Sequence, residues 1–128
     1  MEKAKLQAEY GLYINGQWRP AANGDTYTAE SPADGSHLAV CAQATREDVD
    51  DAVEAAWEAF KTWKKTTPAQ RAALLNKIAD IIDANKEHLA MVESMDNGKP
   101  IRETMNVDIP LSAAHFRYFA GCILAEEG

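Results

Sequence analysis

Residues 45–63 read TREDVDDAVEAAWEAFKTW, and at the start of this segment the chain changes from strand signals to helix signals. Thr45 followed by Asp48 resembles a capping box, with an acid at the fourth place. One amphipathic helix of about five turns is therefore expected. Its apolar side chains recur every three or four residues, at Val49, Ala52, Val53, Ala56, Ala59, Phe60 and Trp63.

Two β-hairpins are predicted before this helix. Asn15-Gly16 stands in the middle of residues 12–18, and Asn-Gly is a strong hairpin signal because both central residues of a type I′ turn need positive φ. A second pair of strands is expected at 26–30 and 37–44, around a turn rich in Pro, Asp and Gly. The polar residues 1–10 are expected to form a flexible lead-in. Hairpins this small are marginal unless a larger element covers them.

Three further helical segments are predicted after the first helix. Thr67-Pro68 is typical of an N-cap followed by proline at the first helical position. A shorter helix at 87–95 ends with Gly98 as its C′ residue. A last segment at 101–127 contains Pro110, which predicts an internal kink or a restart. The predicted order is thus two short hairpins and then four helices. The helices have wide apolar faces, and we expect further protein to cover them.

The composition bounds the possible functions. The 128 residues suffice for one domain or for a piece of a larger protein, with 46% hydrophobic and 26% charged residues. A net charge of −7 argues against general nucleic-acid binding, which needs a basic face. No apolar run approaches the ~18–20 residues that span a bilayer, and no signal peptide is expected. The two cysteines form no CxxC motif, so a reduced, cytoplasmic protein is expected.

The side chains that could carry chemistry form no self-contained catalytic or cofactor site. Cys41 and Cys122 have no base or helix N-terminus beside them in the sequence, and we expect both to be small apolar residues. His37, His88 and His115 share no metal-binding motif. The glycines show neither a GxGxxG nor a P-loop pattern, which excludes a self-contained dinucleotide site by motif logic.

The segment Met95–Pro100 is the densest local signature of the chain. Gly98, Lys99 and Pro100 are what a well-made helix C-terminus requires. Asp96 is the exception, because a carboxylate at this end opposes the helix dipole. A hydrogen bond or a bound cation would resolve that conflict.

The whole chain resembles the N-terminal quarter of the NAD(P)-dependent aldehyde dehydrogenase superfamily. Four stretches carry this resemblance, and they occur in the same order and with the same spacing as in the family. They are Tyr13–Trp18, Ser31–Gly35, Arg46–Trp63, and Met95–Pro100 followed by Glu103. The tail from Asp108 to Ala120 is similar to the bacterial branch that acts on acetaldehyde and related short aliphatic aldehydes.

The resemblance implies an α/β parent fold, in which residues 11–128 are the incomplete N-terminal portion of the cofactor-binding domain. The parent enzyme would oxidise a short aliphatic aldehyde to a carboxylic acid with NAD or NADP. Its cysteine nucleophile, glutamate base and cofactor contacts lie downstream in the family, so no catalytic or cofactor-binding residue is assigned here. The chain alone is expected to bind no cofactor and to be inactive. Its expected partners are the remainder of the enzyme and further copies in a homo-oligomer, with no nucleic acid and no membrane.

Two lesser roles follow from the resemblance by position. Many family members hold a monovalent cation, and the corresponding positions are Ala29, Glu30 and Asp96. One wall of the family's aldehyde entrance tunnel corresponds to the last helix. The positions expected on that wall are Leu111, His115 and Tyr118, with ordinary core packing as the alternative.

Two other functions remain open. The chain could be a truncated, non-catalytic relative that associates with itself or with a partner through its apolar helix faces. It could also be an independent small enzyme, which the missing motifs disfavour. The last residues run in family register without a cap, and this favours a truncated chain as the expectation.

Overall fold

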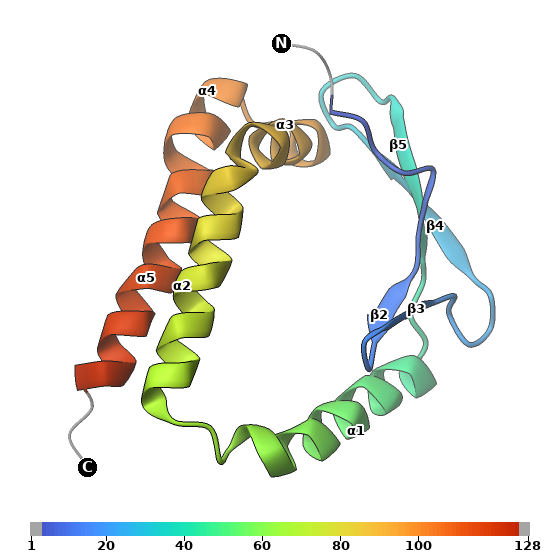
Figure 1. Cartoon of the computed structure of the whole chain (residues 1–128). Helices are drawn as coiled ribbons and strands as arrows, with labels where there is room; N and C mark the ends of the chain where they lie inside the picture. Colours follow the sequence, from blue (N-terminus) through green and yellow to red (C-terminus); the bar gives the residue numbers. More distant parts are fainter. Residues whose placement is uncertain (1–3, 126–128) are drawn as a thin grey trace. The chain divides into compact units, whose positions relative to one another are not determined.

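The computed structural model describes residues 4–125. They fall into two compact units, one spanning Lys5–Lys65 and the other comprising residue 4 and residues 66–125. The first unit holds all the strands and one helix, and the second is helical (Figure 1). The described chain is therefore mixed α/β, as the sequence predicts.

Both predicted hairpins are confirmed in the first unit. Strands β2 (Leu12–Ile14) and β3 (Gln17–Arg19) pair antiparallel around a turn in which Asn15 and Gly16 have φ of 51° and 78°. Both central residues therefore have the positive φ that a type I′ turn requires. Strand β4 (Thr26–Glu30) pairs antiparallel with β5 (His37–Ala42), which ends two residues before the predicted limit.

A further short strand, β1 (Glu9–Tyr10), was not predicted. It pairs in parallel with β5 and completes a three-stranded sheet in the order β1-β5-β4. The last two residues of the expected lead-in are thus part of a sheet. This strand could not be predicted from local patterns, because two residues take part and their partner strand lies about thirty positions downstream.

Helix α1 (Arg46–Trp63) ends the first unit and begins with the predicted capping box. The backbone N–H of Asp48 donates to the Thr45 hydroxyl, and the Asp48 carboxylate accepts from the Thr45 backbone N–H. An aspartate at the fourth place therefore closes the box as a glutamate would.

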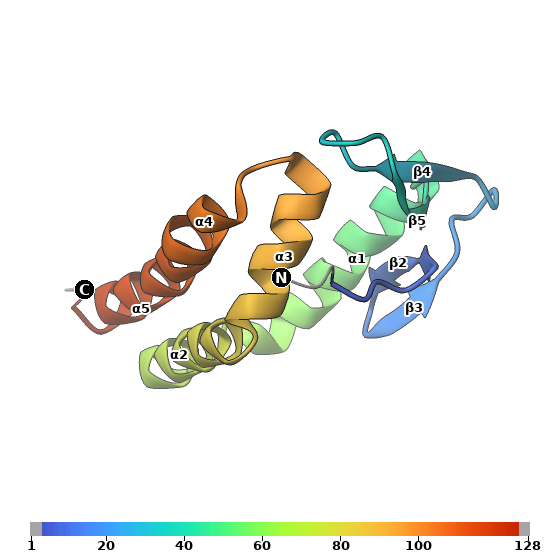
Figure 2. The ribbon, with the colours of Figure 1, turned by 90° about the horizontal axis from the view of Figure 1, so that it is seen from above.

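The helical unit is built on a pair of long helices, α2 (Pro68–Ala84) and α5 (Ile109–Ala125), which lie side by side in both ribbon views (Figures 1 and 2). Small side chains are buried on both helices and let the two backbones approach closely. They are Ala72 and Ala79 on α2, and Ala113 and Ala120 on α5. Arg117 of α5 joins the pair with ion pairs to Asp80 (2.8 Å) and Asp83 (2.7 Å).

The connection between these helices contains α3 (Lys86–Asn97), the single turn α4 (Ile101–Glu103) and a π-helical turn, η1 (Thr104–Asp108). The sequence predicts a kink or a restart at Pro110, whereas the irregular segment of the structure is the π-helical turn η1, which lies just before this proline. Proline cannot donate to the carbonyl four residues back, and its ring crowds that carbonyl, so a wider turn here accommodates it.

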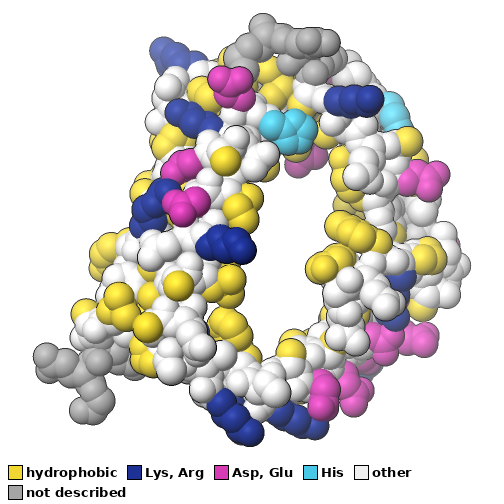
Figure 3. Space-filling view, viewed as in Figure 1, with side chains coloured by type: hydrophobic (Ala, Val, Ile, Leu, Met, Phe, Trp, Pro, Cys, Tyr) yellow, Lys and Arg dark blue, Asp and Glu magenta, His cyan; other side chains and the backbone are white. Residues whose placement is uncertain are grey.

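The interior is made of small residues, whereas large apolar side chains remain exposed on both units. Among the described residues, the buried hydrophobic positions are Ala21, Ala39, Ala72, Ala79, Ala90, Ala113 and Ala120. Figure 3 shows apolar side chains, in yellow, reaching the surface across the molecule. Within residues 4–125 no helix is long and apolar enough to cross a membrane.

Candidate functional site

The three predicted tunnel residues share one exposed face of α5. Leu111, His115 and Tyr118 are spaced by four and three positions, which places them on one side of a helix. Leu111 is 50% exposed and Tyr118 is 66% exposed, and His115 is exposed as well. By helical geometry this face lies opposite the buried Ala113 and Ala120, so it is not an ordinary core face of the described helical unit.

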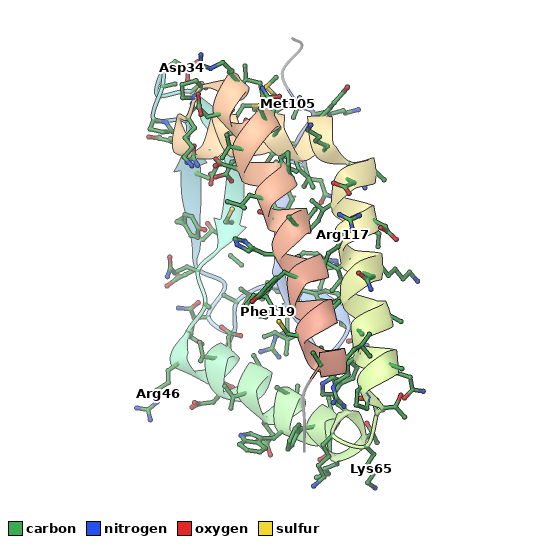
Figure 4. The ribbon with its side chains drawn as sticks, turned by 90° about the vertical axis from the view of Figure 1, so that its left-hand side faces the viewer. Asp34, Arg46, Lys65, Met105, Arg117 and Phe119 are labelled. Carbon is green, nitrogen blue, oxygen red and sulfur yellow. The ribbon has the colours of Figure 1, made fainter. Side chains whose placement is uncertain are left out.

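Figure 4 shows the two sides of α5 through two labelled residues. Arg117 points toward α2, where its aspartate partners lie, and Phe119 points to the other side. The ring of Phe119 meets that of Tyr118 edge to face, with 5.3 Å between centroids. The Leu111 face is therefore largely apolar, with the His115 imidazole and the Tyr118 hydroxyl as its polar groups.

The predicted cation ligands belong to both units. Ala29 and Glu30 are consecutive residues at the end of β4, where the register with β5 shifts. Asp96 lies in the last turn of α3, in the helical unit. The first two are adjacent in the sequence itself, and the three-residue site stays a prediction. No group of three or more His, Cys, Asp or Glu side chains within residues 4–125 is arranged to hold a metal ion.

Other side chains also secure the helix end around Asp96. Gly98 has φ of 80° and its N–H donates to the Ser94 carbonyl, which confirms the predicted C-terminus. The Asn97 side chain accepts from the Lys99 backbone N–H (2.8 Å). Lys99 reaches Asp108 in η1 with an ion pair of 2.7 Å, and this hydrogen bond raises the pKa of its ammonium group.

A buried carboxylate, Asp48, organises the first unit, and the sequence revealed only part of its role. Its side chain is 1% exposed and accepts hydrogen bonds from the N–H of Ala22 (3.1 Å) and from Arg19 Nη2 (2.9 Å), besides Thr45. The pKa of Asp48 is lowered to about 2, first by the Thr45 backbone N–H and then by that of Ala22. The same Nη2 of Arg19 also pairs with Asp51 at 2.8 Å.

The capping box could be predicted because its two residues are three positions apart. The contacts of Asp48 with Arg19 and Ala22 span 29 and 26 positions, and no spacing rule connects such residues. The cluster ties the start of α1 to the end of β3, so its role is structural.

The cysteines and the remaining histidines are dispersed. Cys41 is half-buried on β5 and Cys122 is exposed on α5, and both are free thiols. His37 on β5 and His88 on α3 are exposed. The absence of a catalytic residue from this chain stays a prediction.

Comparison with known proteins places the chain in a family. The family model described as "Aldehyde dehydrogenase family" matches residues 18–128, and the chain therefore belongs to the aldehyde dehydrogenase family. It is 50% identical over 123 residues to an acetaldehyde dehydrogenase of Pseudomonas aeruginosa, covering 96% of this chain and 24% of the relative. It is also 46% identical over 126 residues to a long-chain-aldehyde dehydrogenase of Acinetobacter sp., covering 98% and 25%.

A solved structure confirms the fold. The crystal structure of PnpE in complex with nicotinamide adenine dinucleotide matches with a TM-score of 0.90 and 44% identity, covering 93% of this chain and 24% of that one. The chain thus spans about a quarter of the length of the relatives that it matches.

Proposed function

We propose that this chain is the N-terminal section of an NAD-dependent aldehyde dehydrogenase that acts on a short aliphatic aldehyde. The observation that carries the proposal is the 50% identity to the acetaldehyde dehydrogenase of P. aeruginosa over 96% of the chain. The NAD complex of PnpE, a similar structure, supports NAD as the cofactor of the parent enzyme. The similarity to a long-chain-aldehyde dehydrogenase supports a long-chain aldehyde as the alternative substrate. The experiment below compares a short with a long aldehyde.

The residues present do not fit a cofactor site of their own. The seven glycines of the chain include no closely spaced set before a helix, so the sequence predicts no glycine-rich cradle for a pyrophosphate. No step of cofactor chemistry is therefore assigned to these residues. Their contribution would be steric and apolar, through Leu111, His115 and Tyr118 along one wall of the aldehyde passage.

A cation held by Ala29, Glu30 and Asp96 would add a structural role. Backbone carbonyls and a carboxylate are suitable oxygen ligands for such an ion. It would also offset the unfavourable position of the Asp96 carboxylate at the C-terminal end of α3.

A chimeric enzyme tests this proposal. Residues 1–128 replace the corresponding quarter of the P. aeruginosa acetaldehyde dehydrogenase, and NADH formation is followed with acetaldehyde and with a long-chain aldehyde. We expect the chimera to retain activity and to prefer acetaldehyde, while the 128-residue chain alone forms no NADH. NADH formation by the chain alone, abolished by Cys122→Ala, would contradict the proposal, as would a folded but inactive chimera.

Leu111→Trp in the chimera tests the passage. A bulkier wall should raise KM for acetaldehyde by roughly tenfold, which corresponds to about 1.4 kcal/mol of steric conflict. Leu124→Trp is the matched control, because Leu124 is an exposed leucine on the other side of the same helix. If the two substitutions raise KM equally, Leu111 does not line the aldehyde passage.

A second function is a non-catalytic module that binds itself or a partner. The observation that favours it is the set of large apolar side chains exposed on both units, such as Trp57 (65%) and Tyr118 (66%). A folded, inactive chimera would favour this second function.

A further inference from the structure

Asparagine followed by glycine occurs three times in the chain, at Asn15-Gly16, Asn23-Gly24 and Asn97-Gly98. This dipeptide can modify itself, because glycine has no side chain to keep its backbone nitrogen away from Cγ of the asparagine amide. All three asparagines are exposed to solvent. Sequence and exposure therefore do not distinguish the three dipeptides, whereas their local hydrogen bonds do.

The reaction is deamidation through a cyclic imide. The backbone nitrogen of the glycine attacks Cγ of the asparagine and closes a succinimide ring, while the side-chain amide leaves as ammonia with the proton of the glycine N–H. Water then opens the ring at either carbonyl, which gives aspartate or isoaspartate. One water is consumed and one ammonia is released, with no oxidant or reductant. The attack needs a glycine N–H that can give up its proton and an amide that can turn toward it.

At Asn23 both reacting groups are held by hydrogen bonds. The Gly24 N–H donates to the Ala21 carbonyl at 2.9 Å. The Asn23 side chain donates from Nδ2 to the Asp25 carboxylate at 2.7 Å, and its Oδ1 accepts from the Asp25 backbone N–H at 2.9 Å. Deamidation at this site therefore has to break hydrogen bonds of both the nucleophile and the amide.

Asn97 is held in the same way at the end of α3. The Gly98 N–H donates to the Ser94 carbonyl at 3.1 Å. The Asn97 side chain donates from Nδ2 to the Glu93 carboxylate, and its Oδ1 accepts from the Lys99 backbone N–H at 2.8 Å. The helix end thus restrains this dipeptide as well.

Asn15 lies in the two-residue turn between β2 and β3, and its reacting groups are not restrained in this way. Within residues 4–125, neither the Asn15 side chain nor the Gly16 N–H makes a hydrogen bond. The hairpin is held by the strand residues on either side of the turn, where Ile14 pairs with Gln17. The Asn15 amide can therefore turn toward the Gly16 nitrogen without losing a hydrogen bond.

We propose that Asn15 is the site at which this chain deamidates, and that the fold restricts the same reaction at Asn23 and Asn97. The inference is independent of aldehyde oxidation, because it uses only the local geometry of three dipeptides.

Deamidation changes the surroundings of Asn15 in two ways. The hollow beside Asn15 is lined by Asp51, Glu54 and Glu58 of α1 and by Arg19, so a new carboxylate adds negative charge next to three others. Isoaspartate also adds a methylene group to the main chain of a two-residue turn. Because the length of such a turn fixes the register of its hairpin, the isoaspartyl turn no longer matches the pairing of β2 with β3.

Peptide mapping of the folded 128-residue chain, kept warm at mildly alkaline pH, tests the proposal. Chymotryptic cleavage after Trp18 separates Asn15 from Asn23, and mass spectrometry follows the amide loss at each asparagine. We expect Asn15 to react at least roughly tenfold faster than Asn23 or Asn97, because the other two sites must first break hydrogen bonds. An isoaspartyl methyltransferase should then label the peptide that contains residue 15.

The same chain in urea is the first control. Unfolding removes the hydrogen bonds and leaves three identical dipeptides, so the three asparagines should react at similar rates. A second control uses isoelectric focusing of the ageing folded chain. Asn15→Gln should remove most of its gain of negative charge, because a glutamine would have to close a larger ring. Asn23→Gln, the matched variant, should leave that gain unchanged.

A native chain in which Asn23 or Asn97 reacts as fast as Asn15 would overturn the proposal. The native order of rates persisting in urea would also overturn it, because the neighbouring sequence and not the fold would then set the rates. An Asn15→Gln chain that gains charge like the wild type would do the same. If circular dichroism shows that Asn15→Gln does not fold, the peptide map of the wild type decides.

Discussion

At the scale of single residues, Asp48 connects the start of α1 to β3 and to the loop that follows it. Its carboxylate is buried and accepts from two backbone N–H groups, one hydroxyl and one guanidinium. A buried acceptor lacking these donors would carry its full desolvation cost. Half of this arrangement could be predicted from the Thr45–Asp48 spacing, and the other half required the folded hairpin to bring Arg19 and Ala22 into reach.

Asp48→Asn should lower the melting temperature at neutral pH by roughly 10 °C, because an amide presents N–H where an acceptor is needed. The effect should depend on pH. The folded pKa of Asp48 is about 2, below the ordinary value of 3.8. Its contribution is therefore fully present above about pH 4 and is lost as the pH falls toward 2.

The measurement is thermal unfolding of the wild type and of Asp48→Asn between pH 7 and pH 2. The difference between the two proteins should close in the acid range. Asp51→Asn is the control, because Asp51 is largely exposed and should change the melting temperature by only a degree or two. A difference that stays constant down to pH 2 would show that the Asp48 charge does not stabilise the fold.

At the scale of elements, helix boundaries could be predicted well because their signals are local. Thr67-Pro68 begins α2 and Gly98 ends α3, as expected. The π-helical turn η1 could not be predicted, since its buried Thr104 depends on a hydrogen bond to the Ala90 carbonyl of another helix. Strand β1 could not be predicted for the same reason, because its strand partner β5 is distant in sequence.

Two glycine substitutions should have opposite effects on the helical unit. Gly98→Ala should lower the free energy of unfolding by about 1 kcal/mol, because its φ of 80° suits glycine. Gly121→Ala should raise it by about 0.5–1 kcal/mol, because the helical site offers open space for a methyl group. Urea denaturation of both variants measures the difference. The same sign for both would contradict the helix end at Gly98.

At the scale of the whole molecule, the sequence predicted the mixture of hairpins and helices and the exposure of apolar helix faces. Both follow from short-range patterns. The candidate site was harder to predict from the sequence. The Leu111 face could be placed on one helix, whereas a site built from Ala29, Glu30 and Asp96 depends on residues from separate units. Alanines fill the interior while tryptophans and other large apolar residues stay outside, as a section of a larger enzyme would show.

Determining the gene sequence beyond the codon for Gly128 tests whether this chain is one section of an aldehyde dehydrogenase. We expect the reading frame to continue into a Gly-Gln-x-Cys segment and the rest of a cofactor-binding domain. A stop codon directly after Gly128 would contradict it, and the second function, a non-catalytic binding module, would then be favoured.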